Sequence, residues 1–110
     1  MTPDLLALSR AIGKLPGAPA PQSVRGTRDR AGMAWVLLPH GDDGRLAWHI
    51  DLDDAATGGV MLARAGVDVW VIHDEDGYSL LHRGDRVVED QPTLAAALAH
   101  FFNTRGSWNV

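Results

Sequence analysis

The stretch from residue 67 to residue 105 constrains the fold most, because it reads as consecutive strands that run directly into a helix. Residues 67–73 are the densest β-branched and aromatic run in the chain, and a group of acids with a glycine, suited to a tight turn, follows them. Shorter strand-like runs come at residues 78–82 and 87–89. Pro92 then opens an alanine-rich segment with the apolar spacing of a helix. The sequence therefore predicts a β-meander that leads into a closing helix.

Length and composition predict one domain over residues 1–110 and argue against several functions. With 45% hydrophobic residues, the chain can bury one core but not two. Fourteen acidic and ten basic residues give a net charge of −4, which argues against a nucleic-acid binder held by phosphate contacts. There is no cysteine, which excludes disulfides and thiolate metal sites, and no apolar run approaches the ~20 residues of a membrane span. We therefore expect a cytoplasmic protein without membrane contact.

The basic residues are nine arginines and one lysine, and the acids are twelve aspartates and two glutamates. This bias is typical of a GC-rich genome, such as that of an actinobacterium or one of its phages. It indicates origin and not function.

The N-terminal region predicts an amphipathic helix followed by a proline-rich spacer. Thr2 can cap a helix that begins at Pro3, and leucine and isoleucine recur at three- and four-residue spacing within residues 1–15. We expect this apolar stripe to pack on the protein's own sheet, with the groove of a partner as the alternative. Residues 16–22 hold three prolines and favour an extended connection to the sheet and closing helix in residues 23–110.

The middle of the chain predicts three strands and then a segment open to two interpretations. Residues 24–30 are polar, as an edge strand is, and residues 33–38 are apolar on both faces, as a central strand is. Pro39 should end that strand. Residues 45–52 alternate between apolar and polar. Residues 53–66 fit either a short helix or a hairpin strand, because two adjacent glycines weaken the helix, and we favour the helix.

The expected fold class is α+β, in the order α-βββ-α-βββ-α, with a mainly antiparallel sheet of about five to six strands. By element order alone, the chain is similar to the small acidic dimeric chaperones of type III secretion and their relatives. That resemblance implies a dimer that holds another protein. Self-association is also expected because the strand at residues 33–38 has no polar side to offer water.

Two groups of acidic and histidine residues form a candidate metal site. His49, Asp51 and Asp53 close one predicted strand, and His73 and Asp74 close another. If the intervening segment is a crossover helix, the two strands can lie parallel and both groups then meet at one edge of the sheet. Carboxylates with imidazole suit a divalent metal such as Mg²⁺ or Mn²⁺. The alternative, which we favour, is that these residues are solvated turns and helix caps and that no cofactor is bound.

Motifs for nucleophilic or phosphate chemistry are missing. The serines lie outside any Gly-x-Ser-x-Gly elbow, and Thr57-Gly58-Gly59 lacks the lysine of a phosphate-binding loop. The sequence therefore favours a non-catalytic interaction module, such as a phage or mobile-element accessory protein. A metal-dependent or phosphate-handling enzyme is the alternative.

Tryptophans and arginines mark the candidate interaction surfaces. Four tryptophans are many for this length, and tryptophan is enriched at binding hot spots. Trp35 and Trp48 lie in apolar strands and should be core residues, whereas Trp70 shares a strand face with Asp68 and Ile72. The arginines could form a basic face for an acidic partner, with a nucleic-acid backbone as the alternative. The candidate interaction residues are Trp70, Trp108, Arg25, Arg28, Arg30 and Arg45.

Overall fold

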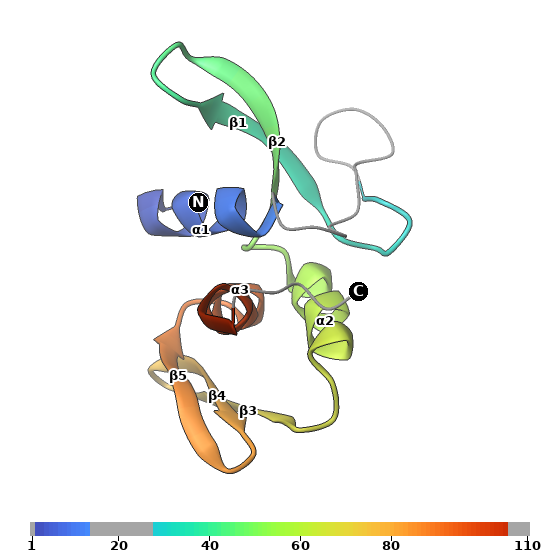
Figure 1. The fold of residues 1–110 in the computed structure, drawn as a ribbon, viewed down its shortest axis with the longest axis vertical. Helices are drawn as coiled ribbons and strands as arrows, with labels where there is room; N and C mark the ends of the chain where they lie inside the picture. Colours follow the sequence, from blue (N-terminus) through green and yellow to red (C-terminus); the bar gives the residue numbers. More distant parts are fainter. Residues whose placement is uncertain (1, 14–27, 106–110) are drawn as a thin grey trace.

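The structure is a computed structural model, and it describes residues 2–13 and 28–105 (Figure 1). Three helices and five strands follow one another along the chain. They are α1 (Pro3–Gly13), β1 (Trp35–His40), β2 (Arg45–Ile50), α2 (Ala55–Ala65), β3 (Val69–Asp74), β4 (Gly77–His82), β5 (Asp85–Gln91) and α3 (Leu94–Arg105). The predicted α+β class is confirmed, and so is the short helix in the middle of the chain.

The strands form two separate antiparallel sheets, where the sequence predicted a single one. Strands β1 and β2 form a hairpin, and β3, β4 and β5 form a three-stranded sheet in chain order. In Figure 1 the hairpin lies at one end of the molecule and the three-stranded sheet at the other, with helices between them. Of the strand predicted at residues 24–30, the described part forms one isolated bridge, from Arg28 to Ala34.

Helix α3 explains the division into two sheets, because its first turns are buried on all sides. The five residues from Ala95 to Ala99 and both phenylalanines, Phe101 and Phe102, are buried. A helix that is apolar all round needs cover on every side. It packs on α1, α2, β4 and β5, so that it occupies the centre of the molecule and not one face of a single sheet.

Helix α1 packs within the chain, on α3 and on β2. The apolar residues Leu5, Leu8 and Ile12 are buried at the expected spacing. The Ser9 hydroxyl donates a hydrogen bond to the carbonyl of Ile50, and Arg10 donates one to the carbonyl of Pro39. Helix α1 therefore covers the β1–β2 hairpin, which contains the strand that the sequence predicted to be apolar on both faces.

Strand β1 continues past Pro39, where it was predicted to end. Pro39 pairs with Leu46, and His40 pairs with Arg45 next to the turn. Both strands of a two-stranded sheet are edge strands, where a proline is tolerated because one side of each strand has no hydrogen-bonding partner. The proline is thus compatible with the strand.

The two adjacent glycines that weakened the prediction of α2 have different surroundings. A Cβ atom on Gly58 would lie 3.1 Å from the backbone nitrogen of Ala95, whereas a Cβ on Gly59 would meet nothing within 4 Å. Gly58 therefore permits the close approach of α2 to α3, and its low helix propensity is offset by that packing. Among the described helices, none is long and apolar enough to cross a membrane.

Turn chemistry fixes the three-stranded sheet. Arg83 and Gly84 both have positive φ, 54° and 87°, as a two-residue hairpin turn between β4 and β5 requires. Farther along β5 the register shifts, and Asp90 there has φ of 54° and donates its backbone N–H to the Ser79 hydroxyl at 3.1 Å. The bulge bends β5, which packs with β4 against α3.

Candidate functional site

The three-stranded sheet has two unlike faces, which alternation along β3 creates. Val69, with 7% of its surface exposed, lies on the face that packs toward α3. Trp70, the next residue, is 69% exposed and lies on the opposite face. Half-buried Ile72 follows on the same side as Trp70. We call this side the outer face.

Register identifies the neighbours of Trp70 on the outer face. Trp70 pairs with Leu81 of β4, which in turn pairs with Arg86 of β5. Ile72 pairs with Ser79. Because directly paired residues of antiparallel strands share a face, the outer face consists of Trp70, Ile72, Ser79, Leu81 and Arg86. Ser79 is the exception to its exposure, since this side chain is fully buried and its hydroxyl accepts the N–H of Asp90 in the bulge of β5. The outer face has an apolar centre, with a guanidinium on one side.

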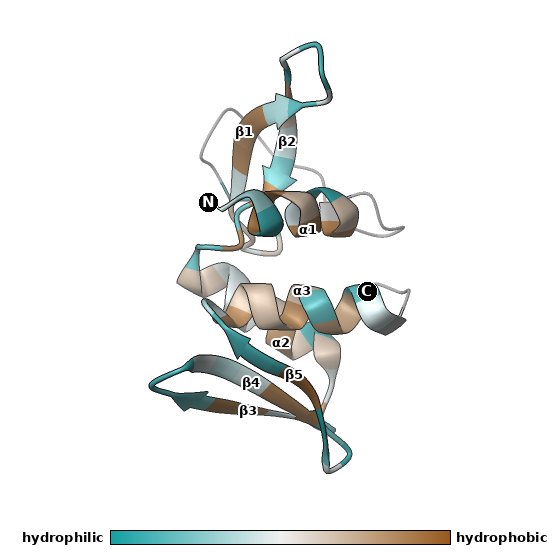
Figure 2. Cartoon of the chain, turned by 90° about the vertical axis from the view of Figure 1, so that its left-hand side faces the viewer, coloured by the Kyte–Doolittle hydropathy of each residue, from teal (hydrophilic) through white to brown (hydrophobic). Residues whose placement is uncertain are grey.

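The inner face is already filled, which leaves no place for Trp70 there. Leu80 and Val88 are buried, and the ring of His82 meets the ring of Phe101 edge to face at 5.2 Å. Figure 2 shows all three helices on this side of the sheet, with β3 as the strand farthest from α3. The outer face therefore carries apolar side chains that the helices do not cover.

The structure separates the two halves of the candidate metal site. His49 lies in β2 and His73 in β3, and these strands belong to different sheets. The two strands therefore do not lie parallel at one edge of a sheet, which the metal hypothesis required. His49 is buried in the hairpin with its ring 5.7 Å from that of His40, whereas His73 is exposed and stacks on Tyr78 at 4.1 Å.

The remaining members of the first group stabilise the turn into α2. The Asp51 carboxylate accepts the backbone N–H of Asp53 at 3.0 Å, and the Asp51 N–H donates to the carbonyl of Ala34 at 2.9 Å. Asp53 is exposed. These hydrogen bonds are those of a turn that leads into a helix, which is the role that the interpretation as turns and helix caps assigned to these residues.

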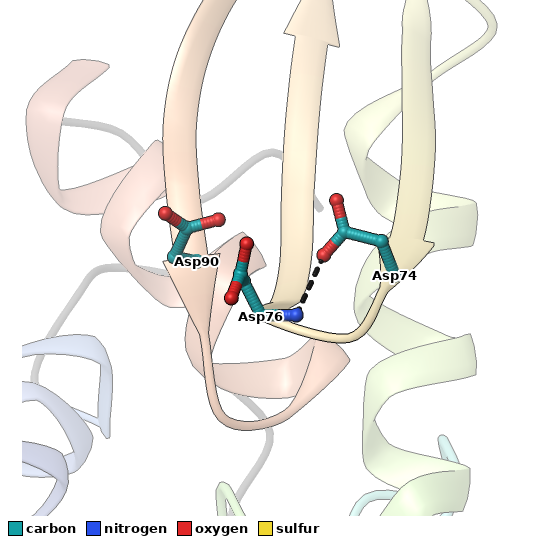
Figure 3. A group of neighbouring side chains, drawn as sticks. All are labelled: Asp74, Asp76 and Asp90. Carbon is teal, nitrogen blue, oxygen red and sulfur yellow. Dashed lines mark hydrogen bonds between the residues drawn. The ribbon is translucent and has the colours of Figure 1, made fainter.

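Asp74 belongs to a different acidic cluster, with Asp76 and Asp90 (Figure 3). One carboxylate oxygen from each lies within 4.8 Å of the others, and all three residues are exposed. Asp74 accepts the backbone N–H of Asp76 at 2.9 Å, as aspartates do in turns. Asp90 reaches the cluster only because of the bulge in β5, so alternation in the sequence could not have placed it there. Exposed carboxylates at a turn do not by themselves make a metal site.

The arginine candidates occupy separate places. Arg28 lies at the base of the hairpin, where its guanidinium makes two hydrogen bonds to Asp54, at 2.7 and 2.8 Å. Arg45 lies beside the hairpin turn, 3.3 Å from Asp43, and both side chains are exposed. Arg30 is exposed in the turn before β1. Arg25 and Trp108 lie outside the described residues, so their predicted roles stay predictions.

Asp54 joins Arg28 to the start of α2. It caps the helix by accepting the backbone N–H of Thr57 at 2.9 Å and its hydroxyl at 3.0 Å. The hydrogen bonds from Arg28, aided by those from Thr57, lower the pKa of Asp54 to about 2. The Thr57 hydroxyl also accepts the N–H of Ala34 at 2.8 Å. This network is structural, since it ties the start of the hairpin to α2.

A groove of about 580 Å³ between α1 and α3 was not foreseen from the sequence. It is formed by segments from both ends of the chain, whose approach no local pattern reveals. Its described walls carry Asp4 and His100 as their ionisable groups. The lining also includes Leu5, Leu8, Gln91 and Asn103.

Comparison with protein-family models, with curated proteins and with solved structures gives no match. The likeness in element order to the secretion chaperones stays a prediction.

Proposed function

We propose that the protein is a non-catalytic binding module that holds another protein against the outer face of its three-stranded sheet. The observation that carries this proposal is the 69% exposure of Trp70, the second residue of a regular, fully paired strand. Tryptophan is the residue most enriched at binding hot spots, where a large apolar ring is removed from water. An exposed ring with apolar neighbours on a flat sheet is suited to such a contact.

The surroundings of Trp70 support binding over accidental exposure. Ile72 and Leu81 adjoin it, so the apolar surface is contiguous, and a contiguous apolar patch marks interaction surfaces more often than a scattered side chain does. Arg86 lies beside it and approaches Glu89 to 3.8 Å. An apolar centre with charged residues at its margin is the usual anatomy of a protein–protein interface.

The positions of the ionisable residues support a role without catalysis. His49 and His73, which an acid–base or metal mechanism would use together, lie in different sheets. The residues of the acidic cluster, Asp74, Asp76 and Asp90, are all exposed, and water there weakens the electrostatic effects that catalysis exploits. A metal-dependent enzyme remains the alternative, and metal titration tests it.

We also place this module in the cytoplasm, as an accessory protein of a phage or other mobile element. The composition supports this: cysteine is absent, and arginine and aspartate dominate the charged residues. Cell fractionation with a tagged chain tests the location. Recovery of the chain with membranes or in the medium would contradict it.

Photo-crosslinking in the cell that encodes the protein tests the proposed face. A photoreactive phenylalanine analogue replaces Trp70, and a matched variant carries it at Leu46, which is 62% exposed on the hairpin. We expect position 70 to give a defined adduct that Leu46 does not give, with the attached protein identified by mass spectrometry. Adding Leu81→Asp, with the fold checked by circular dichroism, should abolish the adduct. Equal adducts from both positions, or none from position 70, would contradict the proposal.

A further inference from the structure

We propose that β3 pairs along its free edge with β3 of a second copy, which gives a two-fold dimer with both Trp70 rings side by side. This inference goes beyond the proposed function, because it concerns the edge of β3 beside the outer face and sets the outer faces of two copies side by side. It follows from the direction of the backbone groups of β3, from the lack of protective residues on its edge, and from the charges that each register would bring together.

The hydrogen-bonding pattern shows which groups of β3 are open. In the described residues β3 pairs only with β4. The N–H of Arg83 donates to the carbonyl of Asp68 at 3.1 Å, so residues 68, 70 and 72 direct their backbone groups toward β4. Val69, Val71 and His73 therefore point their N–H and C=O groups at the open edge. The close stack of His73 on Tyr78 agrees, because pairs without mutual hydrogen bonds bring side chains nearer.

The edge of β3 lacks the features that keep edge strands from pairing. Natural edges are protected by lysine, proline, bulges or charges. Strand β3 reads Val-Trp-Val-Ile-His-Asp, without lysine or proline and with one acid, Asp74, at its last position, and its pairing with β4 is regular. The opposite edge, β5, has four charged residues, two register shifts and a positive φ at Asp90. Of the two edges of this sheet, β3 is therefore the one prepared to accept a strand.

The charged residues of β3 favour one pairing register between two copies of this strand. If Trp70 faces Trp70 across the two-fold axis, Val69 pairs with Val71 of the second copy and Asp68 faces Ile72. Sliding by two residues in one direction sets Asp68 against Asp74 at both ends, and like charges directly opposite are destabilising. Sliding the other way sets each Trp70 against Asp68. The symmetric register thus avoids opposed acids and gives an aromatic pair.

Asp68, which lies just before β3, already has an ion-pair partner within its own chain. The Asp68 carboxylate lies 3.5 Å from the Arg83 guanidinium, and both side chains are more than half exposed. It can therefore stay solvated at the margin of the dimer. The two sheets become one continuous sheet, and the outer faces merge around the two indole rings. Because a strand-edge contact buries little surface, we expect a dimer with a dissociation constant on the order of micromolar.

Molecular mass measured by sedimentation over a wide concentration range is the first test. The wild-type mass should rise from 11.8 kDa toward twice that value. Trp70→Lys sets two ammonium groups opposite each other and should raise the dissociation constant by about 30-fold or more. Leu46→Lys, a charge added at a similarly exposed site on the hairpin, should leave the dissociation constant unchanged.

Cysteine cross-linking tests the register, because the chain has no cysteine of its own. The double variant Asp68→Cys/Ile72→Cys should form disulfide-linked dimers on mild oxidation, since residue 68 of one copy faces residue 72 of the other. Its two cysteines, four residues apart on one strand, are too distant to bridge within a chain. Ile72→Cys alone should not cross-link.

The outcomes separate this inference from the proposed function. Concentration-dependent dimers that Trp70→Lys dissolves and the double cysteine variant traps support it. A wild-type mass that stays near 11.8 kDa overturns it, while a heterologous adduct from position 70 would still uphold the proposed function. If the dimer persists in Trp70→Lys but is lost in Leu46→Lys, the inference is also overturned, because the contact between copies then lies at the hairpin. Efficient cross-linking through Ile72→Cys alone contradicts the register.

Discussion

Asp54 carries more interactions than its position at a helix start suggests, because it serves as a cap and as an ion-pair partner at once. Asp54→Ala removes both and should lower the free energy of unfolding by about 1–2 kcal/mol, the range for loss of an aspartate cap. Asp54→Asn retains an oxygen for the N–H of Thr57 and should cost less. Urea denaturation of both variants measures the difference. Equal losses would show that capping contributes nothing.

The pH dependence of this site has a defined sign. The pKa of Asp54 is lowered to about 2 by Arg28 and Thr57. A depressed pKa contributes stability that is fully present above the unfolded value, near 4, and is lost as the pH falls toward 2. The stability difference between wild type and Asp54→Asn should therefore be constant from about pH 7 to pH 5 and shrink below about pH 4. A difference that does not change with pH would contradict the ion pair.

Metal response tests the enzyme alternative at the residue scale. If the cluster of Asp74, Asp76 and Asp90 is a set of solvated turns, Mn²⁺ or Zn²⁺ should leave the melting temperature unchanged, since only a bound ion stabilises the fold by mass action. Differential scanning fluorimetry with increasing metal checks this. A rise that disappears in Asp90→Asn, but not in the remote control Asp43→Asn, would establish a metal site and reopen the enzyme.

The sequence predicts some of these residues better than others. Alternation in residues 67–72 placed Trp70 opposite the valines, and exposure of Trp70 agrees with that. The partner of Arg28 was not predictable, because Asp54 is 26 residues away and meets it only after the hairpin and α2 have formed. Asp90 likewise joins Asp74 only through a bulge. Periodicity determines the direction of a side chain on its own element, but not its contacts with distant ones.

At the scale of elements, α3 is the helix on which the other helices and the three-stranded sheet depend. Leu98 is fully buried within it, so Leu98→Ala should lower the free energy of unfolding by about 2–5 kcal/mol through the cavity it leaves. Leu94→Ala is the matched control, and it should cost less because Leu94 is only half-buried. Chemical denaturation compares the two. A loss below about 1 kcal/mol at Leu98 would mean that the site can collapse around the alanine.

The three helices and three hairpins were predictable because apolar spacing and turn residues are local. The division into two sheets was not, because it depends on α3 being covered on every side. The glycine pair in α2 shows the same limit: Gly58 lowers helix propensity locally, yet it lets α2 approach Ala95 closely. A local penalty was therefore outweighed by a contact between elements 37 residues apart in the sequence.

For the whole molecule, the helices lie between a hairpin and a three-stranded sheet whose outer face stays open (Figures 1 and 2). The sequence predicted that Trp70 is a candidate interaction residue. It also predicted that a second copy must cover an apolar strand, but it placed that strand at residues 33–38. In the structure α1 packs on this hairpin, and the large exposed ring is in β3. Which strand is at an edge is a property of sheet order, which the sequence alone did not reveal.

The most direct test of strand pairing at the edge of β3, which would join the outer faces of two copies, is amide hydrogen exchange of this strand, measured residue by residue at about 10 µM and about 1 mM protein. If β3 takes up a strand, the amides of Val69 and Val71 should exchange quickly in dilute protein and at least about tenfold more slowly when concentrated. The amides of Trp70 and Ile72 point toward β4 and should be protected at both concentrations. Rapid exchange of Val69 and Val71 at every concentration would contradict pairing at this edge.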